Sequence, residues 1–183
     1  MIEAGRVIRG TAGMAGELGH VQIPMDGLLA PGQPVPRCNC GVFGDVESVA
    51  SLSGIANNLL PFWLGRFPQH PLVGVEVEFA ARSVRELAER GDELGGRIFE
   101  QQAVAIGRLF TIVANVLDPD AYFVGGGVTD TGVEFRTGFV DRVRAATQLR
   151  DEQAAKATFA IVPDLDLAGA RGAALAALRS VAT

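Results

Sequence analysis

Two cysteines, Cys38 and Cys40, lie one residue apart in the glycine-rich stretch CNCGVFGDVE, which spans residues 38–47. Two thiolates on such a turn can bind one metal ion, and zinc takes four ligands from Cys, His, Asp or Glu. His20 and Asp45 would complete that set of four with no ligand left over. Two cysteines alone are better explained as small buried apolar residues in a turn. The nearby histidine gives the zinc interpretation equal weight.

A second candidate pair is Glu17 and His20 in the stretch GELGH. A spacing of three residues beside glycines can aim a carboxylate and an imidazole into the same cleft. A capping glutamate and a structural histidine would produce the same pattern. Taken alone, the pair favours that structural interpretation.

The third candidate is VGGGV, residues 124–128, placed between an expected strand and an expected helix. Glycines at this position let the backbone come close to a flat ligand or a phosphate. The pattern is neither G-x-G-x-x-G nor a P-loop, and a tight strand-to-helix turn explains it equally well.

Apolar periodicity and turn residues predict the elements that must position these side chains. Strands alternate with helices in the second half, which indicates an α/β fold with a partly parallel sheet. We expect a hairpin at 3–10, strands at 20–24, 121–128 (short and buried) and 157–163, a proline-rich loop at 24–37, and helices at 45–53, 55–64, 76–90, 92–117, 132–145 and 167–181.

Composition excludes several classes of protein. The chain has 183 residues, of which 48% are hydrophobic, and this is enough for one substantial core. A net charge of −5 provides no basic surface for nucleic acid or for an anionic membrane. We find no membrane-spanning run and no signal peptide. A disulfide between the two cysteines would be badly strained, so we expect reduced thiols and a cytoplasmic location.

The order of the motifs is more specific than any one of them. From about Gly5 to the end, the series RGTAGMAGELGH, CNCGVFGDVE, LDPDAYFVGGGV and AGARGAALAAL resembles the ROK family (repressor, open reading frame, kinase). The family signature runs E-x-G-H and then C-x-C-G-x-x-G-C-x-E. The resemblance implies a glucokinase-like sugar kinase with an actin-like, ribonuclease H-like α/β fold. Residues 1–183 would form its C-terminal lobe, with a knuckle-like insertion at about 20–47 and the N-terminal lobe absent.

The resemblance also implies roles for individual residues. Glu17 and Glu47 match the family's contacts to sugar hydroxyls, and His20 matches a zinc ligand close to the sugar. The metal set would be His20, Cys38, Cys40 and Asp45. The glycines that match the family's adenosine contact are Gly125, Gly126 and Gly127. The intact parent enzyme would use ATP with Mg²⁺ to phosphorylate a hexose, and it would form a homodimer that binds neither membrane nor nucleic acid through this chain.

The chain departs from the family pattern at three places. Asp45 replaces the third cysteine, and because an oxygen is harder than a thiolate we expect weaker zinc binding. His20 precedes Cys38 by 18 positions, a longer gap than usual, and the insertion carries the prolines of residues 24–37. The family's D-x-G-G-T, G-T-G-x-G and N-D-x-N segments, the last with the general-base aspartate, do not occur.

We therefore expect no sugar phosphorylation by this chain alone, because no catalytic residue of the family pattern is present. Two alternatives remain open: the sugar-sensing lobe of a ROK transcriptional repressor, and a folded remnant without a ligand. Neither the identity of the hexose nor the choice between kinase and repressor follows from the sequence.

Overall fold

The computed structural model describes residues 1–162 and 165–181. It begins with an antiparallel hairpin of β1 (Ile2–Glu3) and β2 (Arg6–Val7), which confirms the predicted hairpin. A short 3₁₀ helix, η1 (Leu18–His20), follows.

The segment between η1 and the first α-helix contains neither the strand predicted at 20–24 nor the helix predicted at 45–53. The strand is reduced to an isolated bridge between Gln22 and Asp45. The helix fails because Asp45 and Ser48 bond to each other's backbone: the Ser48 N–H donates to Asp45 Oδ1 at 2.8 Å, and the Ser48 hydroxyl donates to the Asp45 carbonyl at 2.6 Å. Such local bonds compete with helix formation and hold a turn.

α-Helical structure begins only after Ser51, whose hydroxyl caps the first helix by accepting the N–H of Gly54 at 2.9 Å. α1 (Leu52–Gly54), the π turn η2 (Ile55–Leu59) and α2 (Leu60–Arg66) then follow without a break. α2 carries Pro61 in its first turn, where a residue without an N–H is tolerated. The predicted helix at 55–64 is therefore confirmed, with a wider turn at its start.

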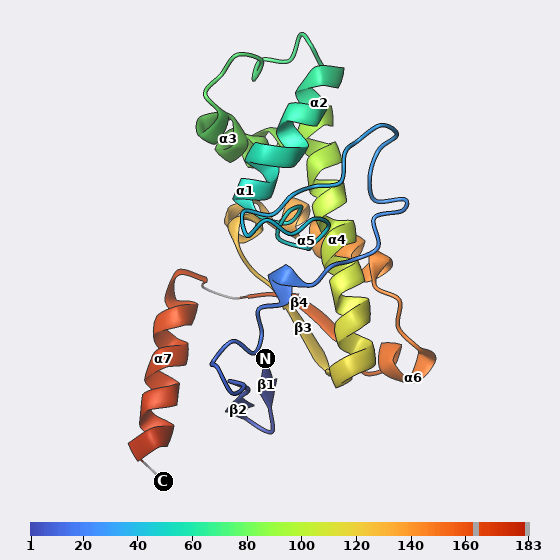
Figure 1. Ribbon diagram of the computed structural model, residues 1–183. Coiled ribbons are helices and arrows are strands. Elements are labelled where there is room, and N and C mark those ends of the chain that lie inside the picture. The colour runs from blue at the N-terminus through green and yellow to red at the C-terminus, as the bar shows by residue number, and fades with distance from the viewer. Residues whose placement is uncertain (163–164, 182–183) are drawn as a thin grey trace.

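Two further helices match their predicted ranges closely: α3 (Val77–Glu89) and α4 (Glu93–Leu117). α4 runs along most of the body in Figure 1, with α2 and α3 near its N-terminal half. Glycines allow close approach to its neighbours: a Cβ at Gly107 would lie 2.6 Å from the Cβ of Ala146 on the next long helix. Most of the apolar face of α4 is thus buried inside the chain, while Val116 and Leu117 at its C-terminal end are exposed.

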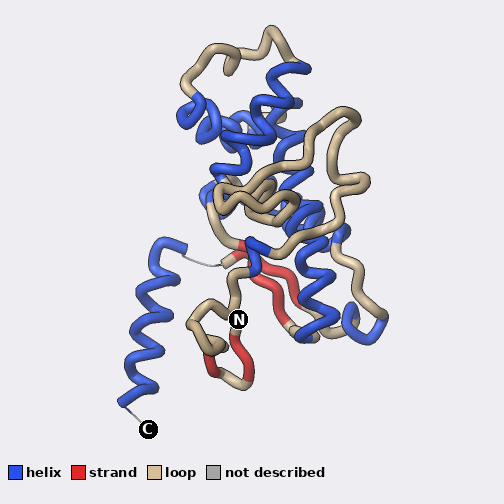
Figure 2. Tube along the Cα trace, viewed as in Figure 1, coloured by secondary structure: helices blue, strands red, loops and turns tan. Residues whose placement is uncertain are grey.

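The only sheet besides the hairpin in the described ranges pairs β3 (Ala121–Val124) with β4 (Thr158–Ile161), in parallel and with Ala121 opposite Thr158. The crossover between these strands carries η3 (Gly127–Asp130), α5 (Val133–Ala146) and α6 (Asp151–Ala154). Figure 2 shows the two strands side by side under the helices. The partly parallel sheet is confirmed, but β3 is not wholly buried: Tyr122 is enclosed and Phe123 is 59% exposed.

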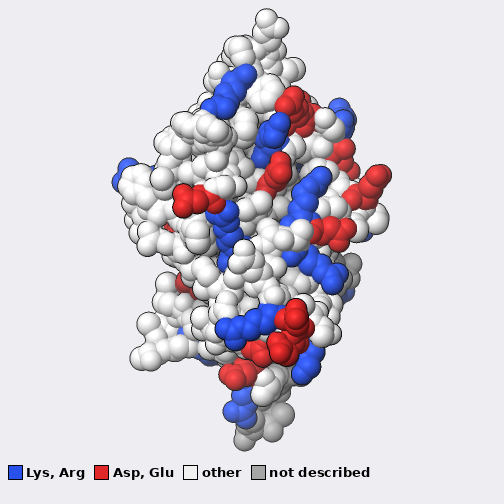
Figure 3. Space-filling view, turned by 90° about the vertical axis from the view of Figure 1, so that its right-hand side faces the viewer, with Lys and Arg blue, Asp and Glu red and all other residues white. Residues whose placement is uncertain are grey.

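The last helix, α7 (Leu165–Val181), begins two residues before its predicted start and extends beside the body in Figure 1. Nearly all its side chains from 166 to 178 are exposed. Acidic and basic side chains are interspersed over the face shown in Figure 3. In the described part of the chain, no helix combines the length and apolar character needed to cross a membrane.

Candidate metal centre and ligand cleft

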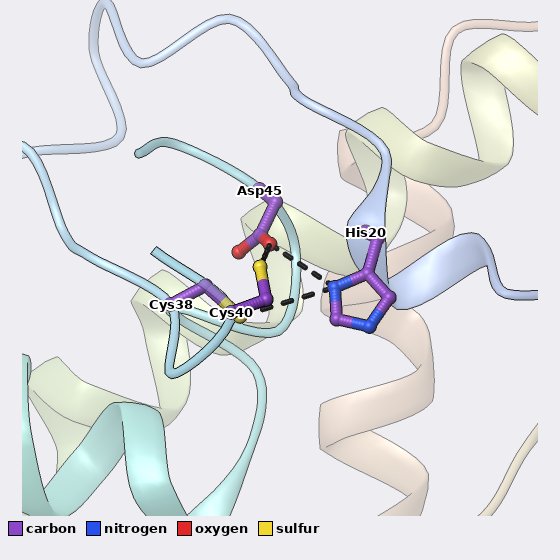
Figure 4. Close-up of side chains that lie close together, drawn as sticks. All are labelled: His20, Cys38, Cys40 and Asp45. Atoms are coloured by element: carbon purple, nitrogen blue, oxygen red, sulfur yellow. Dashed lines mark hydrogen bonds and ion pairs between the residues drawn. The ribbon is translucent and has the colours of Figure 1, made fainter. Parts of the chain in front are cut away.

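The predicted metal ligands converge, and their four ligand atoms all lie within 4.8 Å of one another. His20 comes from η1, whereas Cys38, Cys40 and Asp45 come from one turn (Figure 4). Backbone hydrogen bonds pair the two segments: Val46 N–H donates to Val21 O at 3.1 Å, and Glu47 N–H donates to Gly19 O at 2.8 Å. This pairing brings the imidazole against the turn.

The distances within the cluster fit a tetrahedral zinc ion. His20 Nδ1 lies 3.4 Å from Asp45 Oδ2 and 3.9 Å from Cys38 Sγ. Cys40 Sγ lies 3.8 Å from Asp45 Oδ2. Ligand atoms at tetrahedral positions around zinc are about 3.3 to 3.8 Å apart, given its usual bond lengths. The donor set suits this metal, and these three distances are close to the tetrahedral spacing, although the four ligand atoms together spread over up to 4.8 Å.

Asp45 is the most unusual member of the cluster because its side chain is completely buried. A buried carboxylate is unfavourable unless hydrogen bonds or a cation offset its charge. The Ser48 N–H satisfies Oδ1, while Oδ2 points toward His20 and Cys40 (Figure 4). The second oxygen is thus held in the position of a metal ligand.

The pKa of the Cys38 thiol depends on burial and on its neighbours in the cluster, Asp45 among them. A hydrogen bond from the Cys40 backbone lowers its pKa, but burial, the Cys40 side chain and the negative charge of Asp45 together raise the pKa to about 11. The thiol is therefore protonated at neutral pH in the metal-free protein. Zinc binding must displace this proton, so we expect metal affinity to rise with pH.

Asn58, on η2, clamps the turn from outside. Its side-chain amide donates to the carbonyls of Arg37 at 3.0 Å and Ser48 at 2.9 Å, and its oxygen accepts the Arg37 N–H at 3.1 Å. Sequence analysis missed Asn58 because nothing in the local pattern links η2 to the turn. Because Arg37 and Ser48 flank residues 38–47, these hydrogen bonds from Asn58 hold the two ends of the turn together.

Of the three residues assigned to the sugar, the structure brings two together. His20 Nε2 lies 3.7 Å from Glu47 Oε2, and the side chains are 41% and 38% exposed. Glu17 stands at the N-cap position of η1, but its side chain makes no cap hydrogen bond. The capping interpretation of Glu17 is therefore wrong. Its carboxylate is exposed, just before the histidine in the chain.

The glycine turn at 125–127 contains one residue, Gly126, whose backbone conformation favours glycine. Gly126 has φ 89° and ψ −165°, a region that residues with a side chain rarely adopt. Arg85, on α3, holds the turn by donating to the Gly127 carbonyl at 2.9 Å and to Asp130 Oδ2 at 2.8 Å. Sequence analysis missed this arginine, which no motif marks.

A cleft of about 490 Å³ opens beside the glycine turn. Its walls come from the segment after Glu47, from α3, from α4 and from α5. One wall is formed by Ala50, Ser51 and Leu52, which lie only a few residues after Glu47. A single short segment therefore carries a candidate sugar ligand at one end and a wall of the cleft at the other.

The chain has a mixed α/β fold, and the solved structures that it resembles place it in the actin-like ATPase fold class. The model of the ROK family matches residues 1–180, and the chain belongs to that family. It is 34% identical over 137 residues to N-acetyl-D-glucosamine kinase from Escherichia coli O6:H1. The aligned region covers 71% of this chain and 40% of that kinase. The chain thus spans well under half of that curated relative.

Solved structures of two kinds are similar. A ROK glucokinase from Streptomyces griseus, solved with glucose and AMPPNP, is 26% identical with a TM-score of 0.60, over 86% of this chain and 49% of that one. A ROK transcriptional regulator homologous to the Escherichia coli MLC protein is 25% identical with a TM-score of 0.61, over 86% of this chain and 37% of that one. The predicted family and fold are confirmed.

Proposed function

We propose that this chain is the C-terminal, hexose- and nucleotide-binding lobe of a ROK sugar kinase, with the knuckle at about 20–47 as part of its sugar site. The observation that carries the proposal is the segment from Glu47 to Leu52, which joins the Glu47–His20 pair to the wall of the glycine cleft. A kinase must hold its acceptor hydroxyl beside the γ-phosphate, so its two sites have to be neighbours.

On the sugar side, Glu47 and Glu17 offer carboxylates that accept hydrogen bonds from hydroxyls. His20 would bind zinc through Nδ1, together with Cys38, Cys40 and Asp45. Zinc here would act structurally, by fixing the imidazole ring. The free Nε2–H then points toward Glu47 and can donate to a sugar oxygen.

On the nucleotide side, Gly125, Gly126 and Gly127 would let adenosine lie against the backbone, held in place by Arg85. ATP with Mg²⁺ would be the phosphoryl donor of the whole enzyme, and a cytoplasmic location would supply it. We propose that residues 1–183 bind these ligands without turnover, because the sequence has none of the three phosphate and base segments of the family pattern.

Calorimetric titration of the whole chain tests the proposal. D-glucose and N-acetyl-D-glucosamine are titrated first, and AMPPNP is titrated with and without the sugar. We expect one of the sugars and AMPPNP to bind. Sugar binding without any nucleotide binding would favour the repressor lobe instead, and binding of neither would support a remnant without a ligand.

An assay of ADP release with each sugar at millimolar concentration tests the absence of turnover. We expect no signal above that of a Glu17→Ala variant. Release clearly above that control would contradict the proposal that this chain lacks its general base.

We also propose a homodimer, as the family resemblance implies. Val116 at the end of α4 and Phe123 on β3 are 73% and 59% exposed, and these apolar side chains are available for association. Sedimentation at micromolar concentration should give about twice the mass of the chain; a monomer would contradict this proposal.

A further inference from the structure

The side-chain oxygen of Gln102, a residue of the glycine cleft, has no hydrogen-bond partner among the residues that the structure describes. Gln102, on α4, is only 8% exposed and lines the cleft. Its side-chain NH₂ donates to the carbonyl of Val49 at 3.2 Å. Because that carbonyl can only accept, the amide has to turn its nitrogen toward Val49, which fixes the position of Oε1.

Gln102 Oε1 must open into the cleft. Among the residues that the structure describes, every fully enclosed side-chain nitrogen or oxygen has a hydrogen-bond partner. The amide nitrogen of Gln102 has such a partner, but no donor reaches its oxygen within the same ranges. The oxygen is therefore not fully enclosed, and the cleft is the open space that Gln102 lines.

Two other polar side chains of the cleft, Ser51 and Arg85, are already bonded within the chain. The Ser51 hydroxyl donates to the Glu47 carbonyl at 2.7 Å and accepts the Gly54 N–H at 2.9 Å. Arg85 is bonded to the glycine turn and to Asp130. The remaining walls are largely apolar: Ile55, Phe99, Ile106, Val128 and Phe139.

The cleft thus combines apolar walls with one open, rigidly held acceptor. Arg82 also lines it; its guanidinium acts electrostatically on Glu76, but within the described part of the chain it makes no hydrogen bond or close ion pair. The complementary ligand has a flat, largely apolar body, an N–H donor at its edge and a negative charge elsewhere. An adenine nucleotide has all three features.

We propose that Gln102 Oε1 accepts a hydrogen bond from the exocyclic amino group of adenine, so that the cleft selects adenine over 6-oxopurines. The inference rests on the proposed function, which puts a nucleotide in this cleft. Guanine and hypoxanthine present a carbonyl at the same edge, so two acceptors would face each other and stay unsatisfied. A site built to bond one polar group discriminates strongly against an analogue that lacks it.

The test compares ATP with inosine triphosphate, which carries a carbonyl in place of the amino group, and with purine riboside triphosphate, which carries neither. Affinities are measured by calorimetry on the whole chain. We expect ATP to bind about tenfold more tightly than either analogue, as one buried hydrogen bond implies. In Gln102→Met the preference should fall to about one, whereas Gln69→Met, at an exposed glutamine outside the cleft, should keep it.

The ratio of the affinity for ATP to that for each analogue distinguishes a loss of adenine recognition from a folding defect, because structural damage lowers the affinity for all three nucleotides alike. Should Gln102→Met fail to fold, the comparison of the three nucleotides on the unaltered chain still decides. Equal binding of the three overturns the role of Gln102 and leaves the nucleotide site standing, as does a tenfold preference retained in Gln102→Met. Binding of none of them overturns both the nucleotide site and this inference.

Discussion

His20 and Asp45 lie 25 positions apart in the chain, yet the imidazole Nδ1 is 3.4 Å from a carboxylate oxygen of Asp45 that no water reaches. The contact turns the histidine's other nitrogen, Nε2, toward Glu47, at 3.7 Å. Asp45 therefore orients His20 on the side of the metal, and Glu47 meets it on the side proposed for the sugar. The zinc ligands and the sugar contact can therefore be tested separately, through Asp45 and through Glu47.

The first concerns zinc. Protein purified without chelator should contain about one zinc per chain, because four donors surround one point. Asp45→Ala should lose most of the metal, and Asp45→Cys should retain it against higher chelator concentrations, since thiolate is the softer ligand. Elemental analysis and a thiol reagent measure both. A folded, metal-free wild type with freely reactive Cys38 and Cys40 would refute the site.

The second prediction concerns Glu47. Glu47→Gln should weaken sugar binding by roughly tenfold to a hundredfold, the range expected for a charge-assisted hydrogen bond. Thermal stability should change little, because the carboxylate is 38% exposed. Glu152→Gln, on the exposed surface of α6, is the matched control. Calorimetry that finds equal sugar affinities for the two variants would remove Glu47 from the site.

The third prediction concerns the glycine turn. Gly126→Ala should lower the free energy of unfolding by about 1 to 3 kcal/mol, because its φ of 89° strains any side chain. Gly96→Ala is the control: this glycine lies inside α4 with no atom within 4 Å of the added Cβ. Here the change should stabilise the protein by up to about 1 kcal/mol. Urea unfolding measures both, and equal effects would contradict the strained turn.

The fourth prediction concerns the start of α4. Asp92 accepts the Gly95 N–H at 2.8 Å as the helix cap and faces His70 Nε2 at 3.1 Å. The Leu72 N–H donates to His70 Nδ1, so Nε2 carries a proton and donates to Asp92. Asp92→Ala should cost about 1 to 2 kcal/mol of stability. Asp92→Asn, which keeps a capping oxygen, should cost less; the reverse order in urea unfolding would argue against the cap.

Much of the fold follows from local patterns. Asp92 before an apolar helical repeat and Asp118 before a proline mark both ends of α4, and the structure places it within one residue of the prediction. The structure of residues 45–51, by contrast, could not be predicted from local patterns. Val46 and Val49 are both buried and lie at helical spacing, but Ser48 bonds to Asp45 and holds a turn instead. Two hydrogen bonds outweighed the periodicity.

The sequence by itself was enough to predict the family, the types of metal ligand and the glycine turn. Each of these depends on local residues: on the order of the motifs, on the chemistry of the donor atoms and on the backbone freedom of glycine. Only the tertiary structure decided which of them meet. His20 reaches Asp45 through backbone pairing between distant segments, the Glu17 side chain makes no cap hydrogen bond, and Gln102 lines a cleft bounded by three helices. Such contacts depend on how packed elements approach one another, and local periodicity carries no record of that approach.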